Sequence, residues 1–193
     1  IGGNLMGIET LLKSLEAVKN TVRTGWMLRG IPASIGETVA GHSFEASILA
    51  FYLASKLRDK GVNININKAA VLALFHDLPE AITGDIVKYV KDAIVRTRDF
   101  EEKVSTEAFG GEIASLVREF NELKTYEAKV ARLAEILATH IQGKRYLANG
   151  YSRVEEIINN TLKEIKELIK NEPLSKIADE VNEIISKSRE AYG

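Results

Sequence analysis

Residues 69–80 read Ala69-Ala70-Val71-Leu72-Ala73-Leu74-Phe75-His76-Asp77-Leu78-Pro79-Glu80. The first seven residues are apolar on every side of a helix, which predicts a helix at the centre of the fold. Such a helix delivers the His76 imidazole and the Asp77 carboxylate from the protein interior. Pro79 interrupts it, because proline lacks an amide hydrogen and its ring clashes one turn back. We therefore expect the helix to end near Leu78 and to leave Glu80 at a bend.

Helical periodicity covers most of the remaining chain, and strand alternation is almost absent. We predict an all-α fold, in the form of a compact single-domain helical bundle. The expected helices span approximately residues 11–22, 39–60, 67–78 with Asn67 as the cap, 86–95, 112–123, 126–148, 152–170 and 174–191. In the second of these, a row of residues begins with His42 and faces the core. This row contains His42, Ala46, Leu49, Leu53 and Leu57.

The length of 193 residues fits one domain, residues 1–193, without a linker or an internal repeat. The helices expected within residues 151–193 carry an apolar band. It consists of Val154, Ile157, Ile158, Leu162, Ile165, Leu168 and Ile169. A band of this width suits either core packing, which would complete the bundle, or a dimer contact.

The charge balance and the amino-acid composition exclude several classes of function. The chain has 26 basic and 27 acidic residues, so no global charge draws it to nucleic acid or to a membrane. It has no cysteine, which excludes disulfides, thiolate catalysis and Cys-ligated zinc. No apolar run approaches the roughly 20 residues of a membrane span, and no signal-peptide pattern opens the chain. We therefore expect a soluble, cytoplasmic protein.

Two of the three histidines, His42 and His76, fall on segments that are expected to face the core. Asp77 follows His76 directly, and a buried carboxylate without a partner would cost several kcal/mol. Coordination to a metal removes that cost. With Glu135 as a further carboxylate, these residues form the mixed nitrogen and oxygen set that first-row divalent metals prefer. The leading hypothesis from these residues is a metal-dependent hydrolase.

Each candidate also has a purely structural interpretation. A histidine on an apolar stripe is often a satisfied core residue. Glu135 lies off the apolar stripe of its helix, where it could be a surface residue that pairs with Arg132 one turn back. Asp85 could cap the helix that follows it. His140 matches no partner spacing and is predicted to be structural.

Three stretches of the sequence resemble the HD-domain metal-dependent phosphohydrolases, and in particular their 5'-deoxynucleotidase branch. They are Thr24-Gly25-Trp26-Met27-Leu28-Arg29-Gly30, Gly41-His42-Ser43-Phe44-Glu45-Ala46 and His76-Asp77-Leu78-Pro79-Glu80-Ala81-Ile82-Thr83-Gly84-Asp85. The resemblance covers about residues 8–150. It implies a helical bundle of the HD-domain type that removes phosphate from deoxyribonucleoside 5'-monophosphates.

The resemblance also implies a role for individual residues. His42, His76, Asp77 and Glu135 would bind one divalent transition metal ion, namely Mn, Co, Ni, Fe or Zn. Glu80 would be the acid–base residue, and Asp85 would orient it or the attacking water. Arg23 would clamp the phosphate. Trp26 would cover the sugar or base, with core filling as the alternative. The partners expected are a small nucleotide substrate and a second copy of the chain in a homodimer, with no nucleic acid and no membrane.

Two positions depart from the pattern of this branch. Gly41 stands where an acidic residue usually precedes the first metal histidine, and Glu135 stands where the last ligand is usually Asp. Two alternatives therefore stay open. One is a related HD hydrolase that acts on deoxynucleoside triphosphates, cyclic nucleotides or guanosine tetraphosphate. The other is a non-catalytic scaffold that binds metal or nucleotide. The presence of Glu80 and Asp85 favours an enzyme, and the stretch from Arg23 to Trp26 favours monophosphates.

Overall fold

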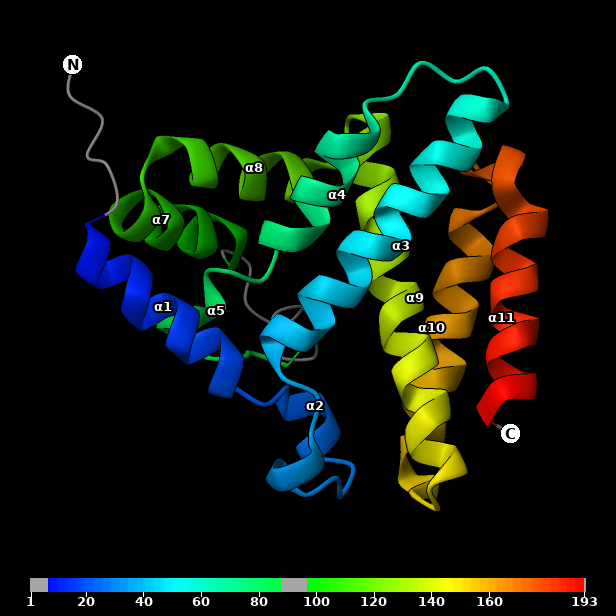
Figure 1. Ribbon diagram of the computed structural model, residues 1–193, viewed down its shortest axis with the longest axis horizontal. Helices are drawn as coiled ribbons and strands as arrows, with labels where there is room; N and C mark the ends of the chain where they lie inside the picture. Colours follow the sequence, from blue (N-terminus) through cyan, green and yellow to red (C-terminus); the bar gives the residue numbers. More distant parts are fainter. Residues whose placement is uncertain (1–6, 88–96, 193) are drawn as a thin grey trace.

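The computed structural model describes residues 7–87 and 97–192 and shows a bundle of helices (Figure 1). Within these residues the extended structure is limited to one isolated bridge between Val22 and Thr38. The all-α prediction is confirmed. The helices are α1 (Ile8–Asn20), α2 (Thr24–Met27), α3 (Val39–Asp59), α4 (Ile66–Phe75), α5 (Glu80–Thr83), α7 (Thr97–Phe109), α8 (Gly111–Glu122), α9 (Tyr126–Ala148), α10 (Glu155–Leu168) and α11 (Ala178–Tyr192). Short 3-10 turns occupy Ala33–Ile35, Ser152–Val154 and Leu174–Ile177.

Three helices, α3, α4 and α9, form the centre of the bundle. The helix α3 packs against both α4 and α9, and α4 also packs against α9. Their contacting faces combine large and small side chains that are fully buried. These include Leu53, Leu57, Leu72, Leu133 and Leu137 together with Ala46, Ala50, Ala69, Ala73, Ala131, Ala134 and Ala138. The alanines let the helix backbones approach closely, while the leucines fill the remaining volume.

The two ends of α4 show how the local sequence sets the position of the His76–Asp77 pair. The Asn65 side chain accepts a hydrogen bond from the Lys68 amide at 3.0 Å and caps the first turn. The predicted cap, Asn67, lies inside the helix instead, so that prediction was wrong by two residues. At the other end, α4 stops at Phe75, before Pro79, and α5 begins directly after this proline.

The apolar band of the C-terminal region belongs to the core. Val154, Ile158 and Ile165 are buried, and α10 packs along α9. In Figure 1, α10 and α11 lie on the side of α9 that faces away from α1, α7 and α8. These three residues therefore take part in core packing, and a dimer contact through the rest of the band stays a prediction. The helices of the described residues include none that is long and apolar enough to cross a membrane.

Three described helices, the short α2 and α5 and the longer α7, were not predicted from the sequence, and one prediction cannot be compared. Residues 97–109 carry many charges and few apolar positions at helical spacing, so their periodicity is weak. The helix predicted near residues 86–95 lies largely outside the described residues. The described part of that range, Ile86 and Val87, is not helical.

Candidate metal centre

The candidate ligands come from the facing ends of α3 and α4. His42 lies in the first turn of α3, where the Thr38 side chain caps the helix by accepting a hydrogen bond from the Gly41 amide at 3.1 Å. His76 and Asp77 directly follow the last residue of α4. Because α3 and α4 pack together, the rings of His42 and His76 meet with their centroids 5.3 Å apart.

His42, His76 and Asp77 form a compact cluster of potential ligand atoms. One atom from each residue lies within 4.8 Å of the other two. An Asp77 carboxylate oxygen is 3.1 Å from Nε2 of His76 and 3.9 Å from Nε2 of His42. Both Nε2 atoms are buried. Nε2 of His42 has no hydrogen-bond partner among the residues that the structure describes, and Nε2 of His76 faces the Asp77 carboxylate without a hydrogen bond of regular geometry. Buried polar atoms nearly always have a partner, so this pair of nitrogens fits a site for a cation.

The orientation of the His76 ring and the lowered pKa of His42 also fit metal binding. Nδ1 of His76 lies 2.7 Å from the Ala73 carbonyl oxygen. A carbonyl can only accept, so Nδ1 donates its proton and the lone pair of Nε2 faces the cluster. Burial lowers the pKa of His42 well below its usual value, and the nearby Arg23 charge lowers it further. For His76, burial lowers the pKa, but the Asp77 and Glu135 carboxylates and the hydrogen bond to Ala73 together raise it, so the net shift is upward.

The donor set matches the metals expected from the sequence. Two imidazole nitrogens and a carboxylate oxygen suit first-row divalent metals, whereas Mg²⁺ and Ca²⁺ prefer oxygen ligands. Burial and the Arg23 charge favour the neutral form of His42. A guanidinium can only donate, so the Arg23 contact at Nδ1 places the ring proton on Nε2, and a metal at Nε2 requires that proton to move to Nδ1. The residues present therefore fit the group that the sequence resemblance implies.

Arg23 reaches this cluster through a short pairing of two loops. Residues 21–23 run antiparallel to residues 37–39, joined by the isolated bridge and by two backbone hydrogen bonds of 2.9 Å. Gly36 permits this approach, because a Cβ atom there would lie 2.3 Å from the Val22 side chain. The pairing places the Arg23 side chain beside the first turn of α3.

The Arg23 guanidinium contacts three groups around the cluster. Its Nη1 lies 3.1 Å from Nδ1 of His42, 3.1 Å from the Thr139 hydroxyl and 3.3 Å from the Glu37 carboxylate. Burial opposes the charge, but four carboxylates, with Glu37 the strongest and Asp77 next, raise the pKa of Arg23. Arg23 is therefore a permanent cation next to the candidate ligands.

Glu37 is a site residue that the sequence interpretation missed. Its carboxylate accepts hydrogen bonds from Trp26 Nε1 at 2.8 Å and from Arg23, and it lies 3.9 Å from Nδ1 of His42. Its amide donates to the Tyr146 hydroxyl at 2.7 Å. Burial raises the pKa of the Glu37 carboxyl, although Arg23 and Trp26 both act to lower it. A carboxylate thus stands near His42 even though Gly41 replaces the acidic residue usual in this branch.

Glu135 lies close to the cluster but is not part of its compact set of ligand atoms. Its charge acts to raise the pKa of both Arg23 and His76, which shows that it faces the same region. Its Oε2 atom, however, is 3.0 Å from Nη1 of Arg132. This is the ion pair that the sequence analysis gave as the structural alternative to metal binding. Its role as a fourth ligand stays a prediction.

Glu80 and Asp85 lie at the two ends of the segment that follows the cluster. Glu80 is buried and begins α5, three residues after Asp77. Asp85 accepts a hydrogen bond from the Thr24 amide at the start of α2, and the Thr24 hydroxyl donates to the Asp85 carbonyl oxygen at 3.0 Å. Asp85 thus links this segment to α2, next to Arg23. The helix that Asp85 could cap lies outside the described residues, so that alternative stays open. The proposed catalytic roles of Glu80 and Asp85 stay predictions.

The structure places Trp26 in a second apolar cluster. The ring is 2% exposed and packs with Ile31, Tyr146, Val154 and Ile158. Its edge meets the Tyr146 ring, with the centroids 5.2 Å apart. This position corresponds to the core-filling alternative, and the contact with the sugar or base stays a prediction.

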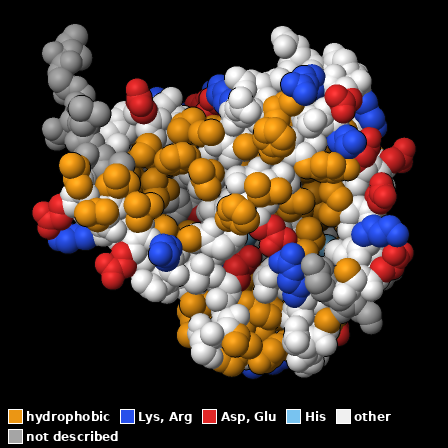
Figure 2. Space-filling model, in the orientation of Figure 1, with side chains coloured by type: hydrophobic (Ala, Val, Ile, Leu, Met, Phe, Trp, Pro, Cys, Tyr) orange, Lys and Arg blue, Asp and Glu red, His pale blue; other side chains and the backbone are white. Residues whose placement is uncertain are grey.

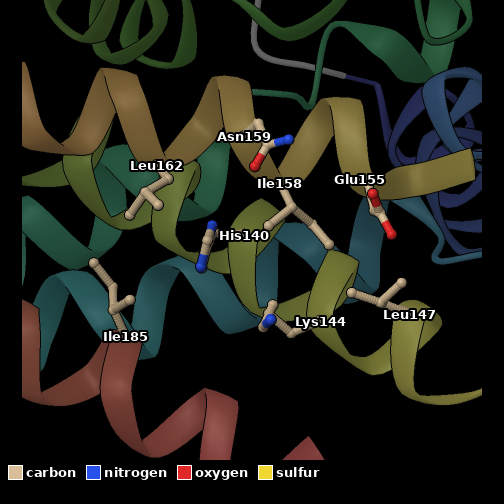
Figure 3. A pocket seen from close by; sticks show the side chains of 8 residues that line it. All are labelled: His140, Lys144, Leu147, Glu155, Ile158, Asn159, Leu162 and Ile185. Atoms are coloured by element: carbon tan, nitrogen blue, oxygen red, sulfur yellow. The ribbon is translucent and has the colours of Figure 1, made fainter. Parts of the chain in front are cut away.

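A cavity of about 200 Å³ lies elsewhere, among α9, α10 and α11 (Figure 3). The buried ring of His140 lines it, and Nδ1 of this ring lies 3.1 Å from the Thr161 hydroxyl oxygen. The Thr161 hydroxyl donates in turn to a backbone carbonyl of its own helix, so it accepts from His140. This contact supports the structural role predicted for His140. The cavity is smaller than the roughly 300 Å³ of typical ligand pockets.

The helical bundle with its cluster of His42, His76 and Asp77 defines a helical domain with a candidate metal site. Comparison with known proteins agrees with this class. The model of one family, described as the HD domain, matches residues 15–178. The chain therefore belongs to the HD domain family. The resemblance to HD-domain phosphohydrolases that the sequence motifs carry is confirmed, and relatives named as 5'-deoxynucleotidases are among the proteins that the chain resembles.

Individual relatives add detail. The chain is 27% identical over 163 residues to the 5'-deoxynucleotidase HDDC2 of Danio rerio, an alignment that covers 78% of this chain and 76% of that protein. It is 37% identical over 73 residues to the 5'-deoxynucleotidase YfbR of Escherichia coli, but this covers only 36% of this chain and 37% of the relative. Among solved structures, the PH0347 protein of Pyrococcus horikoshii has a TM-score of 0.80 at 30% identity and covers 93% of this chain and 99% of its own.

Proposed function

We propose that this protein is a metal-dependent phosphomonoesterase that hydrolyses deoxyribonucleoside 5'-monophosphates to deoxynucleosides and phosphate. The observation that carries the proposal is the cluster of the buried His42 and His76 with the partly exposed Asp77, and the Arg23 guanidinium 3.1 Å from His42. It combines a cation site and a permanent positive charge within one interior region. Two relatives named as 5'-deoxynucleotidases support the choice of substrate.

His42, His76 and Asp77 would hold one divalent transition metal ion, with Glu135 as a fourth ligand. When bound, such an ion neutralises phosphate charge and makes a water molecule more acidic. The other steps belong to side chains of the chain. Arg23 would bind phosphate oxygens, since a guanidinium can donate to two of them at once. Glu80 would take the proton of the attacking water and return it to the leaving oxygen, with Asp85 fixing the segment that carries Glu80.

A phosphate-release assay over nucleotides and divalent metals tests the proposal directly. We expect release from deoxyribonucleoside monophosphates in preference to triphosphates, because Arg23 is a single cation with little capacity for a triphosphate tail. Asp77→Asn should abolish both metal binding and phosphate release, while Asp59→Asn at the exposed end of α3 serves as the matched control. Metal bound without any phosphate release would favour the non-catalytic scaffold. Preference for triphosphates or cyclic nucleotides would favour another HD hydrolase.

The contact of Arg23 with Glu37 determines which substitution of Arg23 is informative. Arg23→Ala would leave the buried Glu37 carboxylate without its cation, a change that typically costs 3–5 kcal/mol of stability. Arg23→Lys keeps the positive charge and loses the planar fork that binds two oxygens. We expect Arg23→Lys to raise KM more than it lowers kcat, because the fork binds ground state and transition state alike. An unchanged KM would remove Arg23 from the substrate site.

Substitutions of Glu80 and Glu135 should have different effects on kcat and on metal binding. Glu80→Gln cannot exchange a proton, so we expect the metal content to persist while kcat falls by roughly 10²-fold. Glu135→Ala should weaken metal binding, and excess metal should partly restore its activity. Elemental analysis and metal titration of both variants distinguish the roles. If Glu135→Ala binds metal as tightly as the wild type, Glu135 is only the partner of Arg132.

A further inference from the structure

An arginine on α9 connects the candidate metal centre to the C-terminal helix α10. Nη1 of Arg132 lies 3.0 Å from Oε2 of Glu135, which follows one turn later on α9. Nη2 of Arg132 donates a hydrogen bond to Oε1 of Glu164 on α10 at 2.9 Å. The helices α9 and α10 pack along each other (Figure 1). One guanidinium therefore bridges a candidate metal ligand and a helix that carries none of the candidate ligands.

This group of charges is less exposed than the ion pairs at the surface of the protein. Many charged side chains stand at the edges of the face shown in Figure 2. A pair such as Lys13 and Glu9, with side chains 74% and 81% exposed, is weakened by water and contributes little to stability. The side chains of Arg132, Glu135 and Glu164 are only 28%, 14% and 31% exposed. Charges that are partly removed from water must be held by one another, so their positions depend on one another.

The charges of the metal centre also act on Arg132. The Glu135 carboxylate raises the pKa of Arg132 the most, burial opposes this shift, and Glu164 and Asp77 raise the pKa further. Glu135 in turn acts to raise the pKa of His76. Arg132 therefore stays charged and interacts with the same carboxylates that would hold the metal.

The two contacts of Arg132 differ in geometry. The contact with Glu164 is a hydrogen bond. Oε2 of Glu135 is buried beside Arg132 but makes no hydrogen bond of regular geometry among the described residues. A carboxylate oxygen can accept more than one partner, so Glu135 can coordinate an ion while it is paired with Arg132. The ion pair with Arg132 and the coordination of a metal are thus compatible roles for Glu135.

We infer that Arg132 is a positioning residue of the metal centre, which fixes the Glu135 carboxylate and is itself fixed by Glu164 of α10. The loss of an outer partner that orients a ligand typically weakens metal binding by about 10–100-fold. A carboxylate that is already oriented loses less conformational entropy when it binds an ion. The helix α10 thereby takes part in metal binding although it contributes no ligand. This inference rests on the proposed function, because it takes Glu135 as a metal ligand.

Titration of the metal-free protein with Co²⁺, followed by calorimetry and by the visible absorption of the bound ion, tests the inference. We expect Arg132→Gln to raise the Kd for Co²⁺ by roughly 10-fold, and Arg132→Lys, which keeps the charge, to raise it less. Glu164→Ala changes a partly exposed side chain and should raise the Kd by about 3-fold. Arg118→Gln, which breaks an ion pair with Glu102 between α8 and α7, is the matched control and should leave the Kd unchanged. Arg132→Lys and Glu164→Ala keep the test decisive if Arg132→Gln does not fold.

A double variant with Glu135→Ala distinguishes positioning from a direct effect of charge. If Arg132 acts through Glu135, Arg132→Gln should change the Kd no further once residue 135 is alanine. If the Arg132 charge only repelled the metal, Arg132→Gln would lower the Kd in both backgrounds. A Kd for Arg132→Gln at or below that of the wild type overturns the inference. A lower free energy of unfolding with an unchanged Kd overturns it as well, because Arg132 would then serve the fold alone.

The single variants of the ligands distinguish a failure of this inference from a failure of the proposed function. If Glu135→Ala weakens Co²⁺ binding but Arg132→Gln does not, the inference is wrong and the proposed ligands stand. If Glu135→Ala leaves the Kd unchanged, Glu135 is not a ligand and the inference is wrong with it. If His76→Ala binds Co²⁺ as tightly as the wild type, the metal centre of the proposed function is refuted.

Discussion

Replacing Trp26 by Phe distinguishes the two roles predicted for this side chain, which are contact with the sugar or base and filling of the core. The ring is buried against Tyr146, and its Nε1 atom donates to the Glu37 carboxylate at 2.8 Å. Phenylalanine fills much of the same space but cannot donate this hydrogen bond. We therefore expect Trp26→Phe to lower the free energy of unfolding and to leave the fold intact.

The expected magnitude follows from the contacts that are lost. A hydrogen bond to a charged group contributes about 1.5–3 kcal/mol, and the smaller ring leaves some of the site unfilled. The total cost should be about 3 kcal/mol. For a domain of this length, each kcal/mol lowers Tm by roughly 2–4 °C, so Tm should fall by roughly 6–12 °C.

Urea unfolding followed by circular dichroism measures this cost, because Trp26 is the single tryptophan and fluorescence loses its probe in the variant. Tyr126→Phe, which removes a hydroxyl from an exposed ring, is the control and should change stability by less than about 0.5 kcal/mol. If Trp26→Phe costs as little as this control and raises KM several-fold, the ring contacts substrate and the core interpretation is refuted.

Two further substitutions test how the helices are held together. Gly143→Ala should cost about 1–3 kcal/mol, because the added Cβ atom would lie 2.8 Å from Cγ1 of Ile158 in α10. Ile158→Ala removes this atom, so the costs of the two substitutions should be less than additive in the double variant, and additive costs in urea unfolding would argue against a direct clash. Asn65→Ala should lower the free energy of unfolding by about 1 kcal/mol, because it removes the cap of α4. Asn67→Ala should change the thermal midpoint little. Equal effects of the two substitutions would show that the Asn65 side chain does not cap the helix.

The sequence predicted the helices that carry strong apolar periodicity. The boundaries of α3 and α9 agree with the predicted ranges to within one residue, because long buried stripes and threonine caps at Thr38 and Thr125 mark them clearly. The helix α7 was missed because charged residues dominate residues 97–109. Its formation depends on packing against α8, which periodicity within the segment does not reveal.

In the candidate site, the residues at helix ends could be predicted from the sequence, whereas a residue in a loop could not. His42, His76 and Asp77 were predictable because two helical patterns place them at the core, and the structure brings them together. Glu37 precedes α3 in a loop, where no repeating pattern distinguishes a buried carboxylate from an exposed one. Its burial depends on the pairing of residues 21–23 with residues 37–39, a contact between segments that do not form a regular sheet.

The position of Glu37 changes how Arg23 should be understood. A long side chain that must be ordered when substrate binds loses conformational entropy at that moment, which weakens binding. Here Glu37, Thr139 and His42 already fix the guanidinium within hydrogen-bonding distance. Trp26 and Tyr146 fix the carboxylate and the loop in turn. The apolar cluster that contains Trp26 and Tyr146 therefore fixes Arg23, the proposed phosphate-binding cation, when the chain folds. A substitution in this cluster can change KM through Arg23 although the substituted side chain lies far from the reacting atoms.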